Sequence, residues 1–275
     1  GDSYVESLQV FPADNFAAVT ARELSATFNT VFRFGISGAP LSHYLYMIEK
    51  EVIAFSPDIL VVNLVHNDFH ESWFGGGGTY DESFARFRLS EGGEIRISEP
   101  EPYTRDWTWW LKRSATFRYF WVRMKIRPQN VKRLWMQLLG GASNSGQYVA
   151  NIDVESARDP RIPVGVEYSF SRLKEIEKTN ALTVILILDA GNRGFRNRQM
   201  TETDGVKAGS VGQMEGIVLD AAKNHGLSII DLSDVFYDDY QENEIPFAFK
   251  HDGHWNSYAH KVVGKRLADF IRKSL

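Results

Sequence analysis

The sequence predicts an α/β fold in which helices cover both faces of a parallel sheet, giving a three-layer α/β/α sandwich. Apolar runs of β type alternate with segments of helical spacing, a pattern typical of parallel strands joined by crossover helices. Residues 182–188 are apolar almost throughout, as expected of a central strand that helices cover on both faces. The alternation stops from about residue 69 to about residue 163, which indicates a large insertion.

Each element of the sandwich is predicted from its own pattern. Short apolar runs predict strands at residues 31–34, 59–65, 182–188 and 227–230. Apolar residues at helical spacing predict helices at residues 14–28, 40–55, 167–177, 211–225 and 258–275. A chain of 275 residues is long for one domain, yet a single α/β domain with an insertion accounts for all of it.

Composition and charge narrow the function classes. The formal net charge of -4 gives no general attraction to nucleic acid, so no nucleic-acid partner is expected. The absence of cysteine excludes disulfides, thiolate metal sites and a cysteine nucleophile, but it leaves the cellular compartment open. The sequence contains no apolar run near the roughly 20 residues that span a bilayer, and its first residues show no export signal.

Four short motifs stand beside predicted strands and helices. They are GDSYVES at residues 1–7, FGISGAP at 34–40, LVHND at 64–68 and HDGHWN at 251–256. In this order they resemble the sequence blocks of the SGNH, or GDSL-like, hydrolases. One such motif alone would be weak because it is short, whereas four in the family's order are specific. The resemblance spans nearly the whole chain outside the insertion.

The resemblance implies a serine esterase, and the chemistry of the residues agrees. A serine hydroxyl is a poor nucleophile until an imidazole takes its proton, and the imidazole needs an acceptor on its other nitrogen. Ser3, His254 and Asp252 are the candidates for nucleophile, base and acid. The family's pattern assigns the oxyanion hole to the backbone N–H groups of Ser3 and Gly38 and to the side-chain amide of Asn67. No cofactor and no metal is expected for this chemistry.

Two departures from the family's pattern bear on the substrate. The last block normally reads DxxH, whereas here the acid lies two residues before His254, and Trp255 follows. This DxHW order resembles alginate O-acetylation proteins and other SGNH domains that handle acetyl groups on polysaccharides. His66 stands where the third block carries glycine. His66 and Trp255 are therefore candidate substrate-binding residues, with space filling as the alternative for His66.

The position of the first motif carries a further expectation. A catalytic residue of an α/β fold normally follows a strand, because such sites lie at the carboxyl edge of the sheet. We therefore expect a strand upstream of Gly1. Without the other motifs, Ser3 would be interpreted as a solvated or helix-capping residue, and Asn67 and Asp68 as a turn or a helix cap.

An aromatic and basic segment lies within the expected insertion. Residues 104–139 carry nine Lys or Arg against one acidic residue, together with five of the seven tryptophans. Such a segment could lie on an anionic membrane surface, form an aromatic platform for sugar rings or bind a polyanionic polysaccharide. The alternative is two helices, divided near Pro128, whose aromatic face packs on the sheet.

Several function classes remain open. The leading hypothesis is hydrolysis of an acyl ester, in the first place an acetyl ester, on a carbohydrate or similar polar alcohol. An O-acyltransferase would use the same residues, a lipid esterase is a further alternative, and a non-catalytic binding module would keep only the fold. A metal-dependent hydrolase would draw its ligands from Asp2, His66, Asp68, His70, Asp252 and His254. The resemblance favours a location outside the cytoplasm and leaves the oligomeric state open.

Overall fold

The computed structural model describes residues 1–27, 30–76, 83–101, 113–118, 159–189, 207–250 and 252–274. The chain divides into two units, one formed by Gly1–Pro100 with Ala150–Leu275 and the other by Glu101–Val149. In the second unit, the described residues include the short helix α6 (Ala115–Arg118). Apart from residues 113–118, the aromatic and basic segment 104–139 lies outside the described residues, so its role stays a prediction.

Among the residues that the structure describes, the first unit is built on a parallel sheet of three strands. They are β1 (Ile59–Val65), β4 (Thr183–Asp189) and β5 (Ser228–Asp231), in the order β1-β4-β5. The predicted central strand is confirmed, since every side chain from Val184 to Leu188 is at most 1% exposed. Alternate side chains of β4 enter two separate apolar clusters, one on each face of the sheet.

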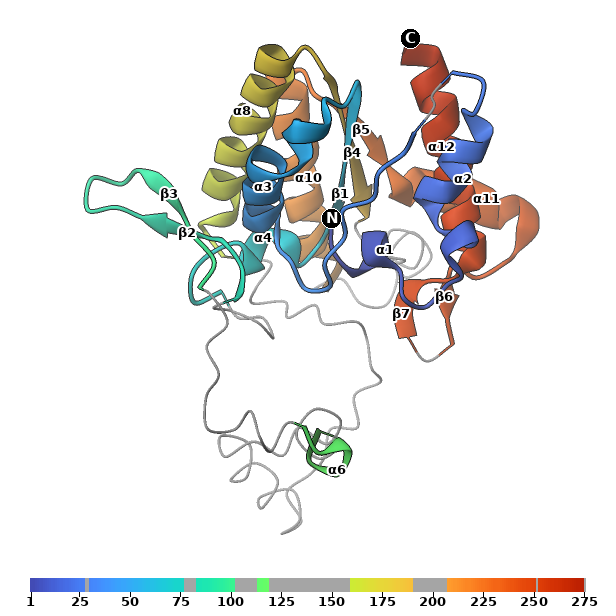
Figure 1. Cartoon of the computed structure of the whole chain (residues 1–275), viewed down its shortest axis with the longest axis horizontal. Helices are drawn as coiled ribbons and strands as arrows, with labels where there is room; N and C mark the ends of the chain where they lie inside the picture. Colours follow the sequence, from blue (N-terminus) through green and yellow to red (C-terminus); the bar gives the residue numbers. More distant parts are fainter. Residues whose placement is uncertain are drawn as a thin grey trace. The chain divides into compact units, whose positions relative to one another are not determined.

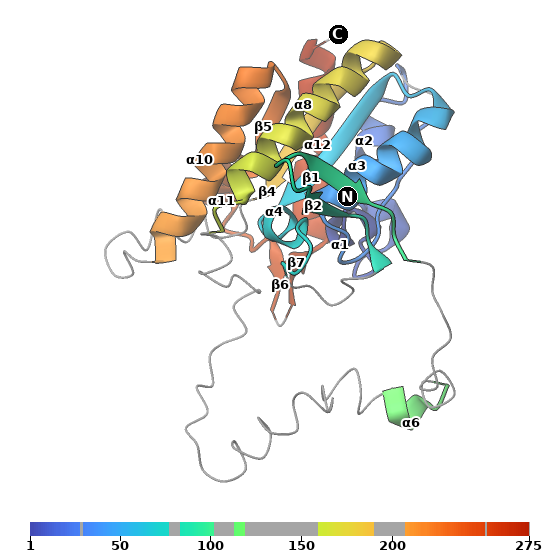
Figure 2. The same cartoon turned by 90° about the vertical axis from the view of Figure 1, so that its left-hand side faces the viewer.

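Helices cover both faces of this sheet, which confirms the predicted three-layer fold (Figures 1 and 2). One face packs against α3 (Leu41–Lys50), α8 (Ile162–Asn180) and α10 (Lys207–His225). The other face packs against α2 (Phe16–Glu23), α11 (Leu232–Asn243) and α12 (Ser257–Ser274). Each of the five predicted helices is found, with boundaries that differ by a few residues and a short 3-10 helix, η2 (Val52–Phe55), after α3.

The pairing of α2 with α12 shows how the sequence sets a close helix contact. Four apolar residues four apart, Ala259, Val263, Leu267 and Ile271, form the buried stripe of α12. Beside this stripe, a Cβ placed on Gly264 would lie 2.6 Å from the Val19 Cβ and 2.7 Å from a backbone oxygen of α2. Only glycine therefore permits the two helices to approach so closely.

The predicted strand at residues 31–34 is wrong, because residues 30–36 have no regular secondary structure. The backbone of Gly1 makes two contacts with this segment: its nitrogen donates to the Phe34 carbonyl at 3.0 Å, and its carbonyl accepts from the Ile36 N–H at 3.1 Å. A cavity of about 480 Å³ separates residues 30–34 from residues 59–62 of β1. A strand is defined by a continuous ladder, and two hydrogen bonds to one residue do not form one.

The remaining elements surround the carboxyl ends of the strands. They are α1 (Ser3–Glu6), η1 (Pro12–Asp14), α4 (Asp68–Glu71), the hairpin β2 (Arg86–Leu89) with β3 (Ile95–Ser98), and the hairpin β6 (Ala248–Phe249) with β7 (Asp252–Trp255). The expected insertion from 69 to 163 thus begins within the first unit, which includes α4 and the β2–β3 hairpin. Among the described residues, no helix is long and apolar enough to cross a membrane.

Candidate active site

Ser3 begins the one-turn helix α1, which Asp2 caps. The Asp2 carboxylate accepts a hydrogen bond from the Tyr4 N–H at 3.0 Å and lies 3.4 Å from the Ser3 hydroxyl. Asp2 is 3% exposed, and burial raises the pKa of its carboxyl. The cap fixes the backbone of α1 and leaves the Ser3 side chain partly accessible.

His254 connects Ser3 to Asp252. Its Nε2 lies 2.9 Å from the Ser3 Oγ, and its Nδ1 is hydrogen-bonded to the Asp252 carboxylate. In a neutral imidazole, Nδ1 then donates to Asp252 while Nε2 accepts the Ser3 proton. Burial acts to raise the pKa of Asp252, but the hydrogen bonds from the side chain and backbone of His254 lower it overall. The carboxylate therefore stays ionised and can stabilise an imidazolium.

The DxH spacing fits this geometry because both residues lie on the strand β7. Side chains two residues apart point to the same face of a strand, so Asp252 and His254 lie side by side. The Asp252 carboxylate also accepts the backbone N–H of His254 at 3.0 Å. One intervening residue is therefore enough for the acid to reach the imidazole.

The expected oxyanion residues Gly38 and Asn67 lie on two separate loops. Gly38 lies in the turn between the irregular segment 30–36 and α3. Its φ of +78° is a left-handed conformation that favours glycine. Asn67 lies two residues after the end of β1, at the N-cap position of α4, where its side chain makes no capping hydrogen bond. In the described part of the chain no hydrogen bond joins Gly38 or Asn67 to Ser3, and their role in an oxyanion hole stays a prediction.

Two carboxylates that the motif analysis missed hold these loops. The Glu6 carboxylate, on α1, accepts hydrogen bonds from the Ser37 N–H at 2.8 Å and from the Ser37 hydroxyl. The helix that carries Ser3 is thereby bonded to the loop that carries Gly38. The Glu71 carboxylate accepts a hydrogen bond from the Asn67 side chain; burial raises the pKa of Glu71, and this bond opposes the rise.

Asp68 is a structural residue beneath Asn67. It is fully buried, and its carboxylate accepts the Tyr44 hydroxyl at 2.9 Å and the Val65 N–H at 2.8 Å. Burial, reinforced by the nearby Asp2, raises the pKa of Asp68 well above its ordinary value. Asp68 thus ties the end of β1 to α3 and fixes the turn that begins at Asn67.

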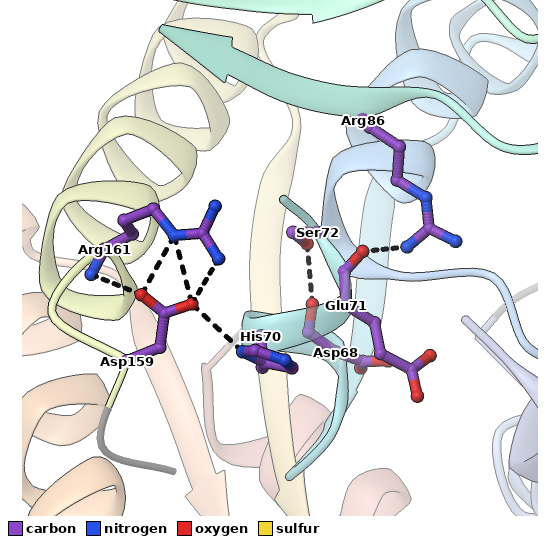
Figure 3. Close-up of polar contacts among 7 residues, drawn as sticks. All are labelled: Asp68, His70, Glu71, Ser72, Arg86, Asp159 and Arg161. Atoms are coloured by element: carbon purple, nitrogen blue, oxygen red, sulfur yellow. Dashed lines mark hydrogen bonds and ion pairs between the residues drawn. The ribbon is translucent and has the colours of Figure 1, made fainter. Parts of the chain in front are cut away.

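A polar cluster joins α4 to the start of α8 (Figure 3). The His70 Nδ1 contacts the Asp159 carboxylate at 3.0 Å, and the Arg161 guanidinium binds the same carboxylate at 2.6 Å. Nearby, the buried Arg86 donates to the Glu71 carbonyl. The cluster therefore stabilises α4, the one-turn helix that follows Asn67.

The ligand set considered for a metal-dependent hydrolase does not come together. Among the residues that the structure describes, no three His, Asp or Glu side chains are grouped as metal ligands. His70 is directed to Asp159, Asp68 to Tyr44, and His254 to Ser3. That ligand hypothesis is therefore wrong for these six residues.

Of the two candidate substrate-binding residues, Trp255 requires a correction. It is 1% exposed and packs in the apolar cluster between the sheet and α12, so it has no surface to offer a substrate. On β7 it alternates with His254 and points to the opposite, buried face. His66 is half-buried, and its role as a substrate contact stays a prediction.

The comparisons with known proteins agree with this fold. No family model and no curated protein matches the sequence. The solved structure of the acetyl xylan esterase AlAXEase matches with a TM-score of 0.51 and 11% identity, over 98% of this chain and 96% of that chain. LAE5, an α/β hydrolase enzyme from the metagenome of Lake Arreo, Spain, matches with a TM-score of 0.50 and 12% identity, over 98% of this chain and 91% of that chain. At such identities the likeness shows the fold alone, and the chain shares the α/β fold of these two solved structures.

Proposed function

We propose that this chain is a serine esterase that works through an acyl-serine intermediate. The observation that carries the proposal is the continuous line of hydrogen bonds from the Ser3 hydroxyl through His254 to Asp252. These three residue types in this order activate a serine, because the imidazole accepts the proton and the carboxylate stabilises the imidazolium. Their approach across 251 positions of sequence agrees with the expectation from the motifs.

The proposed reaction proceeds in two half-reactions. The Ser3 Oγ attacks the ester carbonyl carbon while His254 takes the hydroxyl proton, and the oxyanion lies against the Ser3 and Gly38 N–H groups and the Asn67 amide. The tetrahedral intermediate collapses, and the leaving alcohol takes the proton from His254. Water, deprotonated by His254, then attacks the acyl-serine, and the carboxylic acid leaves as Ser3 regains its proton.

We favour an acetyl ester of a carbohydrate as the substrate. One solved structure that shares the fold, with a TM-score of 0.51, is that of an acetyl xylan esterase. The DxHW order resembles SGNH domains that handle acetyl groups on polysaccharides, which agrees with such a substrate. An acyltransferase would use the same acyl-serine and replace water by a sugar hydroxyl, and a lipid ester is the less favoured substrate.

The proposal is tested by labelling with a fluorophosphonate probe and mapping the adduct by mass spectrometry. We expect an adduct on Ser3 in the wild-type chain, none in Ser3→Ala, and a rate lowered by about 10⁴ or more in His254→Ala. Labelling should be unchanged when a metal chelator is added. An adduct on another residue, or labelling of His254→Ala at the wild-type rate, would contradict the proposal.

The acyl acceptor is tested separately. Acetylated xylo-oligosaccharide is incubated with the chain, with and without an excess of unacetylated oligosaccharide. Free acetate in both incubations would support hydrolysis. Acetyl transfer to the added sugar in place of acetate release would instead support the acyltransferase alternative.

A further inference from the structure

The short strand β7 carries His254 but lies outside the central sheet. It pairs only with the two-residue strand β6 among the described strands, and the register shifts between the two β6 residues. A strand of this length has few backbone hydrogen bonds to fix its position. Yet the His254 Nε2 must stay near 2.9 Å from the Ser3 Oγ, which requires further contacts.

A buried hydrogen bond joins β7 to the centre of the sheet. The Trp255 indole N–H donates to the Asp189 carboxylate at 2.8 Å, and both residues are at most 3% exposed. Asp189 is the last residue of β4, the most buried strand of the central parallel sheet as described. A hydrogen bond between two buried groups is strong and directional, and the loss of either partner of this bond costs stability.

The residue after the nucleophile packs on the residue after the base. The Tyr4 and Trp255 rings meet edge to face with centroids 4.9 Å apart, and the Tyr4 ring lies 5.1 Å from the His254 ring. The Tyr4 hydroxyl donates to the Gly253 carbonyl at 3.2 Å. Tyr4 therefore touches β7 on either side of His254, while its backbone continues directly from Ser3.

We infer that Asp189 and Trp255 are a positioning pair, which holds His254 in hydrogen-bonding register with Ser3 through the contact between Trp255 and Tyr4. Neither residue touches the reacting atoms. Asp189 holds the Trp255 indole at the end of the central strand, and the indole in turn holds β7 in place. Tyr4, on α1, contacts β7 and so sets the distance between the two elements. This role gives the tryptophan of the DxHW motif a function other than substrate contact, and it rests on the proposed serine-hydrolase function.

The test compares variants of this pair by their rate of fluorophosphonate labelling. Trp255→Phe keeps an aromatic ring but loses the N–H donor, and Asp189→Ala loses the acceptor. We expect each to label Ser3 about a hundredfold more slowly, since a displacement near 1 Å has that effect on a reacting pair. Asp189→Asn keeps a carbonyl oxygen that can accept the indole N–H, so it should label within about threefold of the wild type.

A matched control separates positioning from loss of stability. Phe170→Leu removes buried volume on the opposite face of the sheet, where Phe170 is fully buried. It should lower Tm but leave the labelling rate unchanged. With p-nitrophenyl acetate as substrate, Trp255→Phe and Asp189→Ala should lower kcat and leave KM close to the wild-type value.

The outcomes distinguish this inference from the proposed function. If Trp255→Phe and Asp189→Ala label as fast as Phe170→Leu, or if Asp189→Asn is as slow as Asp189→Ala, the positioning role is overturned. If the wild-type chain itself is not labelled at Ser3, the proposed function fails instead. If Trp255→Phe does not fold, the pair of Asp189 variants decides the question.

Discussion

The half of the candidate site that carries His254 and the half that carries Asn67 are held in place by different contacts. Around His254, the support is aromatic packing and one buried hydrogen bond between Trp255 and Asp189. Around Asn67, the support is a set of carboxylates, Glu71 on Asn67 itself and Asp68 on the end of β1. The base is thus positioned by aromatic packing together with the buried hydrogen bond from Trp255 to Asp189, whereas the oxyanion side depends on several hydrogen bonds to acidic groups.

Removal of the Asn67 amide is expected to have the largest effect on the oxyanion side. Asn67→Ala should lower kcat for p-nitrophenyl acetate by about 10² to 10³ with little change in KM, because the amide is needed only as the oxyanion forms. Tm should change by a few degrees at most, since Asp68 and not Asn67 anchors the turn. A wild-type kcat in Asn67→Ala would show that the Asn67 amide is not part of the oxyanion hole.

A smaller effect is expected from the contact between α1 and the Gly38 loop. Glu6→Ala removes both hydrogen bonds to Ser37 and should lower kcat/KM about tenfold, because the Gly38 loop is then no longer bonded to α1 through this carboxylate. Glu6→Gln keeps a carbonyl acceptor and should fall between Glu6→Ala and the wild type. Equal activity of all three would show that the Gly38 loop is fixed without Glu6.

The sequence could predict features that depend on neighbouring residues, but not contacts between residues far apart in the chain. The strands β1, β4 and β5 are predicted because their sequences are continuously apolar, as buried strands are. Asp252 is proposed from its motif, and the alternation of side chains along β7 explains how its DxH spacing reaches His254. Asp189 is missed although it ends the central strand, a place where α/β sites gather. Its partner Trp255 lies 66 positions away, and no local pattern indicates such a pair.

The prediction of a substrate contact at Trp255 and the prediction of a strand at residues 31–34 are wrong for the same physical reason. In both cases the structure depends on which residues pack or pair with the segment, and the local sequence does not show this. Trp255 follows the base in the chain, which suggested substrate contact, but the other face of β7 packs against the core. Residues 31–34 have the apolar composition of a strand, but in the described part of the chain the backbone of this segment is paired only at its end, where Gly1 donates to Phe34. Composition predicts which segment can be a strand, and a ladder partner determines whether it is one.

The smallest expected effect concerns pH and a buried histidine beside Trp255. Burial lowers the pKa of His260 to about 4, while its Nδ1 accepts the Phe16 N–H at 3.3 Å. Because the folded pKa is below the unfolded value near 6.5, this histidine stabilises the fold above pH 6.5, and the contribution is lost as pH falls toward 4. His260→Asn offers a carbonyl acceptor near the Nδ1 position and cannot titrate.

The decrease in Tm between pH 6.5 and pH 4 should therefore be smaller in His260→Asn than in the wild type, by a few degrees, although the variant starts from a lower Tm. Burial also lowers the pKa of His43 to about 4, and this residue accepts the Ala85 N–H beside Tyr44 on the oxyanion side. His43→Asn is thus the matched variant for the other half. If both variants flatten the pH dependence and only His260→Asn slows labelling of Ser3, then the base side depends on the aromatic packing around Trp255. If neither flattens it, the two histidines do not account for acid sensitivity.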